Sequence, residues 1–390
     1  MGLISEIMCK HTYQGNPLPP NIVFIAACNP YRQGEKNIMK NAGLNVKEAH
    51  QELKNLNQKE IENLEKSAKN NLVYTVNPLP HSLLNYVFNF GNLTKEDEEK
   101  YISSMILEPI MRTSPLSKGK NIEEEEIKEE IKKNKDFSSI HLLAKDMISS
   151  AQQYIRDKND ISSVSLREIR RFNIFYEFFY DYLKKRKEIY EDENNIQFYE
   201  EDNEFYKNLD DYLIQAYGIN LSIFVCYYLK ITNKEQRNGL LQKLNELFKK
   251  FDKSFEDKDF LDLPKKEELF IVNNIKLNKG IAKNRALLEN LFSIFVSINN
   301  KVPIFIVGKP GCSKSLSVQL ITKSMQGNVS ESLFFKSLPK ILVHSYQGSL
   351  ASTSKGVENI FAIARNVYKS LKQDDKKNNI SLIFFDEMGL

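Results

Sequence analysis

Two segments in the last quarter of the chain carry the residue types of a nucleotide-phosphate site. The first reads Gly-Lys-Pro-Gly-Cys-Ser-Lys-Ser at residues 308–315, directly after the apolar run at 304–307. A glycine-bearing loop between a strand and a helix points backbone amides at an anion, and the helix N-terminus adds positive potential. Lys314 can reach the outer phosphates, and the Ser315 hydroxyl can ligate Mg²⁺. The predicted binding residues are Gly308, Lys309, Pro310, Gly311, Cys312, Ser313, Lys314 and Ser315.

One position departs from the phosphate-loop pattern. Ser313 stands where the pattern has its second glycine, so a side chain either narrows the cradle or biases a backbone angle that glycine takes freely. Gly308 and Gly311 remain. The simpler alternative is a glycine-rich turn that opens a helix, but a Lys-Ser pair after a strand argues against it.

The second segment reads Leu-Ile-Phe-Phe-Asp-Glu at residues 382–387 and ends another apolar run. Asp386, at the end of a buried strand, can hold a magnesium ion, while Glu387 orients a water on the γ-phosphate. Such a pair alone is weak evidence, because acidic residues often end strands by facing solvent. Together with the phosphate loop it predicts a Mg²⁺-ATP site. Its catalytic residue is Glu387 and its metal ligands are Ser315 and Asp386.

Composition sets the class of protein. The chain has 390 residues, of which 41% are hydrophobic and 27% charged, as in soluble globular proteins of two or three domains. A net charge of +4 is too small to indicate a basic surface for nucleic acid, so no nucleic-acid partner is predicted. The four cysteines form no CxxC pair, which excludes a disulfide framework and favours a reducing, cytoplasmic location. The longest apolar stretch, 221–229, is too short to span a bilayer, so we predict a core element and no transmembrane segment.

The remaining patterns predict the elements that position this site. Apolar runs at 21–28 and 304–307 predict buried parallel strands, and 72–76 predicts another strand. The aromatic-rich stretch 165–183 predicts a helix whose rings form a core, although a base-stacking platform is the alternative. Charged stretches, including 251–268, predict linkers.

These segments resemble a known family. The phosphate loop with serine at the late glycine position, and Tyr-Gln-Gly-Ser-Leu-Ala-Ser-Thr-Ser at 346–354 before the acidic strand, resemble the mysterin-like family. Mysterin-like proteins are giant RING-type E3 ubiquitin ligases whose dynein-like core carries tandem AAA+ modules. Segments 26–32, 76–84 and 164–169 are similar to the same family, so the resemblance spans most of the chain.

The resemblance implies an α/β fold of partial P-loop AAA+ modules, with parallel-sheet cores and a helical lid between them. Residues 1–115 would finish one core with its sensor strand, 116–265 would form the helical lid and linker, and 266–390 would begin the next core. The chain would then be a fragment spanning two adjacent modules. Asn29 would be sensor 1 and Arg167 sensor 2, both catalytic residues of the earlier module's site.

The predicted function is therefore ATP binding and hydrolysis, with Mg²⁺, by an AAA+ ATPase segment; ubiquitin transfer would belong to the parent protein. The implied partners are the remaining AAA+ modules and RING region of the parent and, through the parent, a ubiquitin-conjugating enzyme. Two alternatives stay open. One is a structural module that holds ATP without turnover, and the other is part of a dynein- or midasin-type motor without ligase activity.

Overall fold

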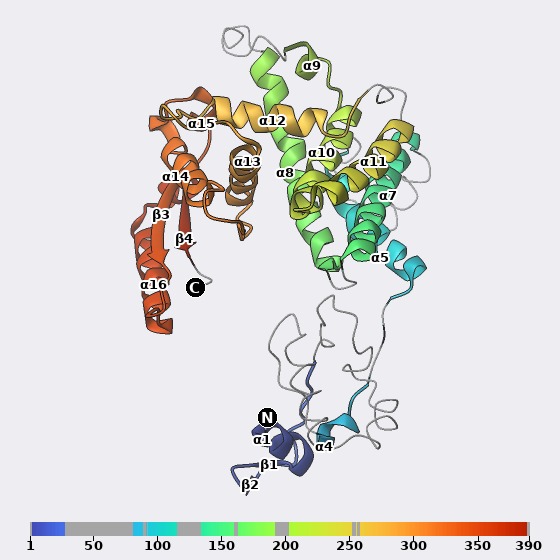
Figure 1. Cartoon of the computed structure of the whole chain (residues 1–390), viewed down its shortest axis with the longest axis vertical. Coiled ribbons are helices and arrows are strands. Elements are labelled where there is room, and N and C mark those ends of the chain that lie inside the picture. Colours follow the sequence, from blue (N-terminus) through green and yellow to red (C-terminus); the bar gives the residue numbers. More distant parts are fainter. Residues whose placement is uncertain are drawn as a thin grey trace. The chain divides into compact units, whose positions relative to one another are not determined.

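The structure is a computed structural model that describes residues 2–27, 81–88, 91, 93–114, 134–159, 163–191, 203–251, 255 and 258–387. The chain divides into two compact units, Met1–Asn92 and Leu93–Leu390 (Figure 1). Asn29 and the strand predicted at 72–76 lie outside the described residues.

The first unit contains short elements. These are α1 (Gly2–Ser5), the π-helix η1 (Glu6–Lys10), an antiparallel pair of β1 (Thr12–Tyr13) with β2 (Asn16–Pro17), and α4 (His81–Leu84). The prediction of a buried strand at 21–28 is wrong for residues 22–27, which form no strand and leave Val23 81% and Ile25 93% exposed. An extended segment is buried only when neighbours pair with it and cover its faces, and no described strand pairs with this one.

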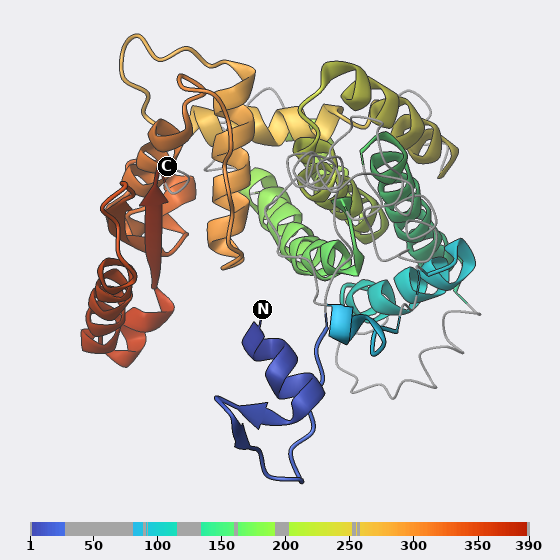
Figure 2. The same ribbon diagram turned by 60° about the horizontal axis from the view of Figure 1, so that its bottom comes forward.

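The second unit begins with a helical bundle (Figure 2). Several of its helices start at a side chain that accepts a hydrogen bond from a first-turn amide, as Thr94 does from Asp97 and Asp210 from Leu213. The bundle elements are α5 (Lys95–Arg112), α7 (Lys135–Lys158), α8 (Leu166–Glu191), α9 (Asn203–Lys207), α10 (Asp211–Cys226), η7 (Tyr228–Lys230), α11 (Lys234–Phe251) and α12 (Asp262–Asn273).

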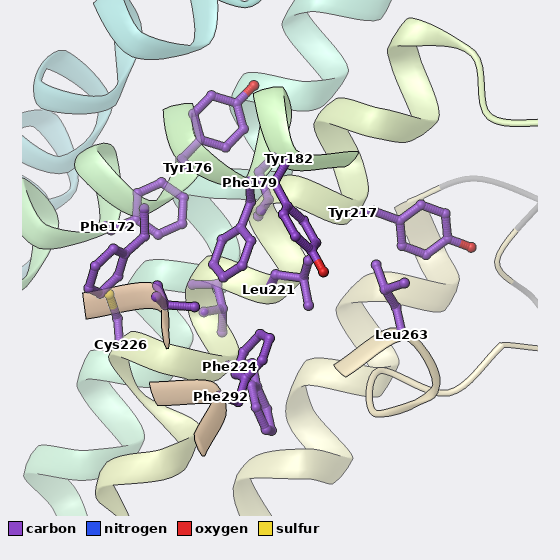
Figure 3. Packing of buried hydrophobic residues seen from close by; sticks show 14 of the residues in the cluster. Phe172, Tyr176, Phe179, Tyr182, Tyr217, Leu221, Phe224, Cys226, Leu263 and Phe292 are labelled. Carbon is purple, nitrogen blue, oxygen red and sulfur yellow. The ribbon is translucent and has the colours of Figure 1, made fainter. Parts of the chain in front are cut away.

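Aromatic side chains fill the core of the bundle. Phe172, Tyr176 and Phe179 of α8 are buried against α10, and Phe224 packs edge-on against Phe292 (Figure 3). The predicted core helix at 165–183 is thus confirmed. The span Asp211–Lys230 is long and apolar enough to cross a membrane, but 78% of its apolar window is buried inside the structure. The apolar stretch at 221–229 is therefore a core element, as predicted.

A buried polar cluster joins α8, α9 and α12. The hydroxyls of Tyr182 and Tyr206 donate to the two carboxylate oxygens of Glu267, and Arg186 Nε lies 3.4 Å from Glu267 Oε2. The Arg186 guanidinium carbon lies 3.3 Å from the ring centroid of Phe270. Glu267 is fully buried, and both of its carboxylate oxygens accept hydrogen bonds. The cluster therefore links α8, α9 and α12.

The linker predicted at 251–268 is wrong for its described residues. Phe255, Phe260 and Leu263 are buried in the core, and α12 begins at Asp262. Three apolar anchors between charged residues are enough to hold the segment in place. The predicted boundary between 265 and 266 falls inside α12, and α5, which the resemblance assigns to the first core, packs on α7 and α8. The three predicted domain ranges remain predictions.

The rest of the second unit alternates helices and strands. Strand β3 (Lys340–Gln347) pairs in parallel with β4 (Asn379–Asp386), with Lys340 opposite Asn379 and Gln347 opposite Asp386. Helix α16 (Ser354–Ser370) packs on both strands. The other elements are α13 (Arg285–Asn299), α14 (Lys314–Ser324), η9 (Gly327–Val329), α15 (Leu333–Lys336) and α17 (Gln373–Lys377).

This part bears out the predicted α/β fold class only in part, since a parallel pair of strands covered by a helix is present. Residues 304–307 form no strand, and Phe305 is 90% and Val307 93% exposed, so the predicted buried strand before the loop is wrong. Within the described ranges, helices predominate and the parallel sheet has two strands. The predicted partial P-loop sheet core is therefore not confirmed over these residues.

Candidate phosphate and magnesium site

The phosphate loop leads into α14 through two left-handed backbone positions. Gly311 has a φ of 85°, and Ser313, the N-cap residue, has φ 57° and ψ 23°. A serine in this backbone conformation carries a strain energy on the order of 1 kcal/mol, whereas a glycine adopts the conformation without that strain. The Ser313 carbonyl accepts from the Ser317 amide at 2.9 Å, so the helix begins immediately and presents free first-turn amides.

Lys314 lies over the loop. Its ammonium donates to the carbonyls of Gly308 at 2.8 Å and Lys309 at 3.0 Å. Lys309 and Pro310 are themselves exposed. The cation is therefore at the mouth of the loop and must exchange these carbonyls for phosphate oxygens when an anion binds.

The loop and the acidic strand meet through Ser315 and Asp386. Ser315 Oγ lies 3.0 Å from both carboxylate oxygens of Asp386, the last residue of β4. A hydroxyl and a carboxylate are hard oxygen ligands that suit Mg²⁺, which keeps several water or phosphate ligands. In the described residues no three His, Cys, Asp or Glu side chains form a metal cluster, so a protein-only metal cage is not found there.

Glu387 follows β4 with a left-handed φ of 56°. Its Oε2 accepts from Gln347 Nε2 at 2.7 Å, and the Gly348 amide donates to the Asp386 carbonyl at 2.8 Å. A Cβ on Gly348 would lie 2.5 Å from the Glu387 carbonyl oxygen, so this close approach requires glycine. The end of β3 thus holds the acidic pair.

Sequence reasoning missed Gln347 and Gly348 as site residues. They lie in the stretch 346–354, which carried the family resemblance, but their role depends on the register that sets Gln347 beside Asp386. A polar residue and a glycine at the end of a strand were the available signal.

Asn290 of α13 was also missed. Its Nδ2 donates to the Cys312 carbonyl at 2.9 Å, across 22 positions of sequence. A single asparagine on an amphipathic helix matches no motif, so the sequence offered no signal for it.

The predicted sensor residues are not brought to this site. Arg167 is exposed in the first turn of α8, and its amide donates to Ser165 Oγ at 3.3 Å. Within the described residues the structure gives Arg167 no contact with the phosphate loop, and Asn29 lies outside them. Both were assigned to an earlier module, and both roles remain predictions.

A glycine-bearing loop that opens a helix and an acidic residue at the end of a strand are features that P-loop nucleotide-binding proteins share. Residues 280–390 match the family described as the RNF213 AAA domain. The chain is 29% identical over 99% of its length to E3 ubiquitin-protein ligase rnf213-beta of Danio rerio. It is 27% identical, again over 99% of its length, to E3 ubiquitin-protein ligase RNF213 of Homo sapiens and of Mus musculus.

The chain spans 7% of the length of each of these relatives. The resemblance to mysterin-like ligases is confirmed, since the similarity runs along nearly the whole chain and residues 280–390 match the family described as the RNF213 AAA domain. The matched range includes α13, the phosphate loop and the acidic strand.

Proposed function

We propose that the chain binds Mg²⁺-ATP at residues 308–315 and, as part of a larger ubiquitin ligase, supports its hydrolysis. The observation that carries the proposal is the meeting of Ser315 Oγ with both oxygens of Asp386 at 3.0 Å. It joins two segments far apart in sequence into one hard-ligand pair at the mouth of an anion-binding loop.

Each residue then has a chemical task. The loop amides and Lys314 bind the phosphates, for which Lys314 leaves the carbonyls of Gly308 and Lys309. Ser315 and Asp386 would hold the magnesium ion, which supplies charge compensation to the phosphate oxygens when bound. Glu387 orients the attacking water through its carboxylate, and Gln347 fixes the position of that carboxylate.

Substitution of Lys314 tests the binding half of the proposal. We expect Lys314→Ala to weaken the affinity for a fluorescent ATP analogue by at least about tenfold, because the ammonium would offset the charge of the phosphates. Lys323→Ala, exposed near the end of the same helix, is the matched control and should bind as the wild type does. Equal affinities of the Lys314 variant and the wild type would remove the nucleotide site.

Substitution of Glu387 tests turnover. Glu387→Gln keeps the shape of the side chain but weakens its acceptor oxygens, so phosphate release should fall by about a hundredfold while ATP stays bound. The measurement is phosphate release together with nucleotide retained on the protein. Equal release from both proteins would exclude Glu387 from the mechanism.

A static nucleotide-binding module is the second candidate. The hydrogen bond from Gln347 to Glu387 favours this candidate, because a carboxylate oxygen that accepts from Gln347 is less available to orient a water molecule. In that case the wild type retains ATP without phosphate release, and Glu387→Gln changes neither quantity. Gln347→Ala separates the two functions, since freeing the carboxylate should alter the rate of release only in a hydrolysing site.

The wider role follows from the relatives, whose names describe E3 ubiquitin ligases. We infer that this segment acts beside further AAA+ modules, a RING region and a ubiquitin-conjugating enzyme, in the cytoplasm, rather than in a motor without ligase activity. Assaying ubiquitin transfer by the parent protein with Lys314→Ala in place tests this inference. Asn29 and Arg167 would serve a separate nucleotide site in that assembly.

A further inference from the structure

The phosphate loop is held by a side chain that belongs to neither of its flanking elements. Asn290 of α13 donates from Nδ2 to the Cys312 carbonyl at 2.9 Å. We propose that Asn290 is a positioning residue for nucleotide, which aims the amide of Ser313 at the bound phosphates. This inference rests on the proposed nucleotide binding at residues 308–315.

The geometry of the peptide bond gives the mechanism. In a planar trans peptide the carbonyl of one residue and the amide of the next point in opposite directions. Fixing the Cys312 carbonyl towards α13 therefore turns the Ser313 N–H away from α13. That amide joins the free first-turn amides of α14, which form the anion-binding end of the helix.

The conformation of Ser313 explains why the loop needs such a clamp. Ser313 is left-handed with φ 57°, and its side chain makes no capping hydrogen bond to the helix. A glycine would adopt this conformation without cost, whereas serine tends to relax away from it. A hydrogen bond on the preceding carbonyl opposes that relaxation, because rotating the peptide would break it.

Helix α13 is itself firmly fixed, so Asn290 is a rigid support. The residue before it, Glu289, accepts from Arg237 of α11 at 2.6 Å and 3.1 Å and from Arg285 at 2.6 Å. Further along, Phe292 stacks on Phe179 of α8 with ring centroids 6.0 Å apart (Figure 3). The clamp thus transmits the position of the helical bundle to the phosphate loop.

The experiment measures binding of a fluorescent ATP analogue with Mg²⁺ to the purified chain. Asn290→Ala removes the donor, and Asn290→Asp keeps the shape but cannot donate as a carboxylate. Asn299→Asp is the matched control, because Asn299 lies on the same helix and donates from Nδ2 to the Phe295 carbonyl at 2.8 Å, away from the loop. Thermal melting of each variant reports its stability.

We expect both Asn290 variants to bind the analogue about five- to tenfold more weakly than the wild type, as loss of one hydrogen bond to a loop carbonyl implies. The control should bind as the wild type does. Adding Ser313→Gly to Asn290→Ala should restore most of the affinity, since glycine holds the left-handed position without the clamp. A purely structural role of Asn290 would not be rescued in this way.

Two results would overturn the proposal. One is wild-type affinity in both Asn290 variants, and the other is an equal loss in the Asn299 control. If the wild type itself binds no analogue, the proposed function fails and this inference fails with it. If an Asn290 variant does not fold, the single variant Ser313→Gly provides the test. Because glycine adopts the left-handed conformation without cost, this variant should bind the analogue at least as tightly as the wild type, and weaker binding would contradict the proposal.

Discussion

The helical bundle and the nucleotide-site region of the second unit use similar apolar residues with opposite results. In the bundle, rings such as Phe172, Tyr176 and Phe179 are buried. Beside the phosphate loop, Phe305 and Val307 face solvent, and α16 buries Ala364 alone among its residues. The bundle completes its core within the described residues, whereas the site region leaves apolar surface uncovered.

The reason lies in how each element satisfies its backbone. A helix closes its hydrogen bonds within itself and needs only one covered face. A parallel strand needs neighbours on both edges and covers on both faces. The residues of the proposed site therefore lie in the less completely packed region. Their positions depend on a few specific contacts.

The largest expected effect tests how firmly the bundle is held. Glu267→Ala leaves Arg186 without this buried carboxylate and both tyrosine hydroxyls without their acceptor. Removing one partner of a buried ion pair costs about 3–5 kcal/mol of unfolding free energy. Chemical denaturation measures it, and Glu331→Ala, which breaks the exposed pair with Lys276, is the control with little change. A small loss of unfolding free energy in Glu267→Ala would mean that the bundle tolerates the removal of this buried carboxylate.

The next prediction concerns pH. Burial, with a smaller contribution from the charge of Glu289, raises the pKa of Glu268 from its ordinary 4.5 to about 8. Between these values the unfolded chain releases a proton that the folded chain keeps. Stability should therefore fall as pH rises from about 4.5 to about 8, by on the order of 2–4 kcal/mol, and level off above.

Glu268→Gln removes this titration, because the amide stays neutral at every pH in that window. Denaturation midpoints measured from pH 5 to pH 9 should therefore fall less in the variant than in the wild type. The exposed Glu235→Gln should keep the wild-type slope. An unchanged slope in Glu268→Gln would show that this carboxyl does not govern the pH dependence of the bundle.

Alanine in place of two glycines compares the regions directly. Gly348→Ala sets a Cβ 2.5 Å from the Glu387 carbonyl oxygen, so the backbone at the acidic pair must move. We expect phosphate release to fall by about tenfold. Gly218→Ala, inside α10, meets Tyr176 at an ordinary 3.5 Å and should alter stability by at most about 1 kcal/mol. Full activity in Gly348→Ala would show that the site adapts freely.

The smallest effect concerns the exposed apolar run. Phe305→Ser should change unfolding free energy by at most about 0.5 kcal/mol, because the ring is almost fully exposed, but should lower the binding of a hydrophobic dye. Phe172→Ser, in the bundle core, should instead destabilise the fold by several kcal/mol, on the order of 3–5. Strong destabilisation by Phe305→Ser would show that other residues cover this run in solution.

Local patterns in the sequence predicted much of this protein correctly. The aromatic spacing of residues 165–183 specified a core helix, since helical periodicity is set by adjacent turns. The apolar run that ends at Asp386 was confirmed as strand β4, because a short run of residue types specified it. Nucleotide binding by residues 308–315 and the order of the modules remain predictions.

The tertiary structure decided what depends on neighbours distant in sequence. The contact of Asn290 with the Cys312 carbonyl and that of Gln347 with Glu387 follow from helix placement and strand register, which no local pattern encodes. The strand predictions at 21–28, over its described residues, and at 304–307 were wrong for the same reason. A parallel strand is buried only when neighbouring strands pair with it and other elements cover its faces. A helix forms its backbone hydrogen bonds internally, whatever it packs against.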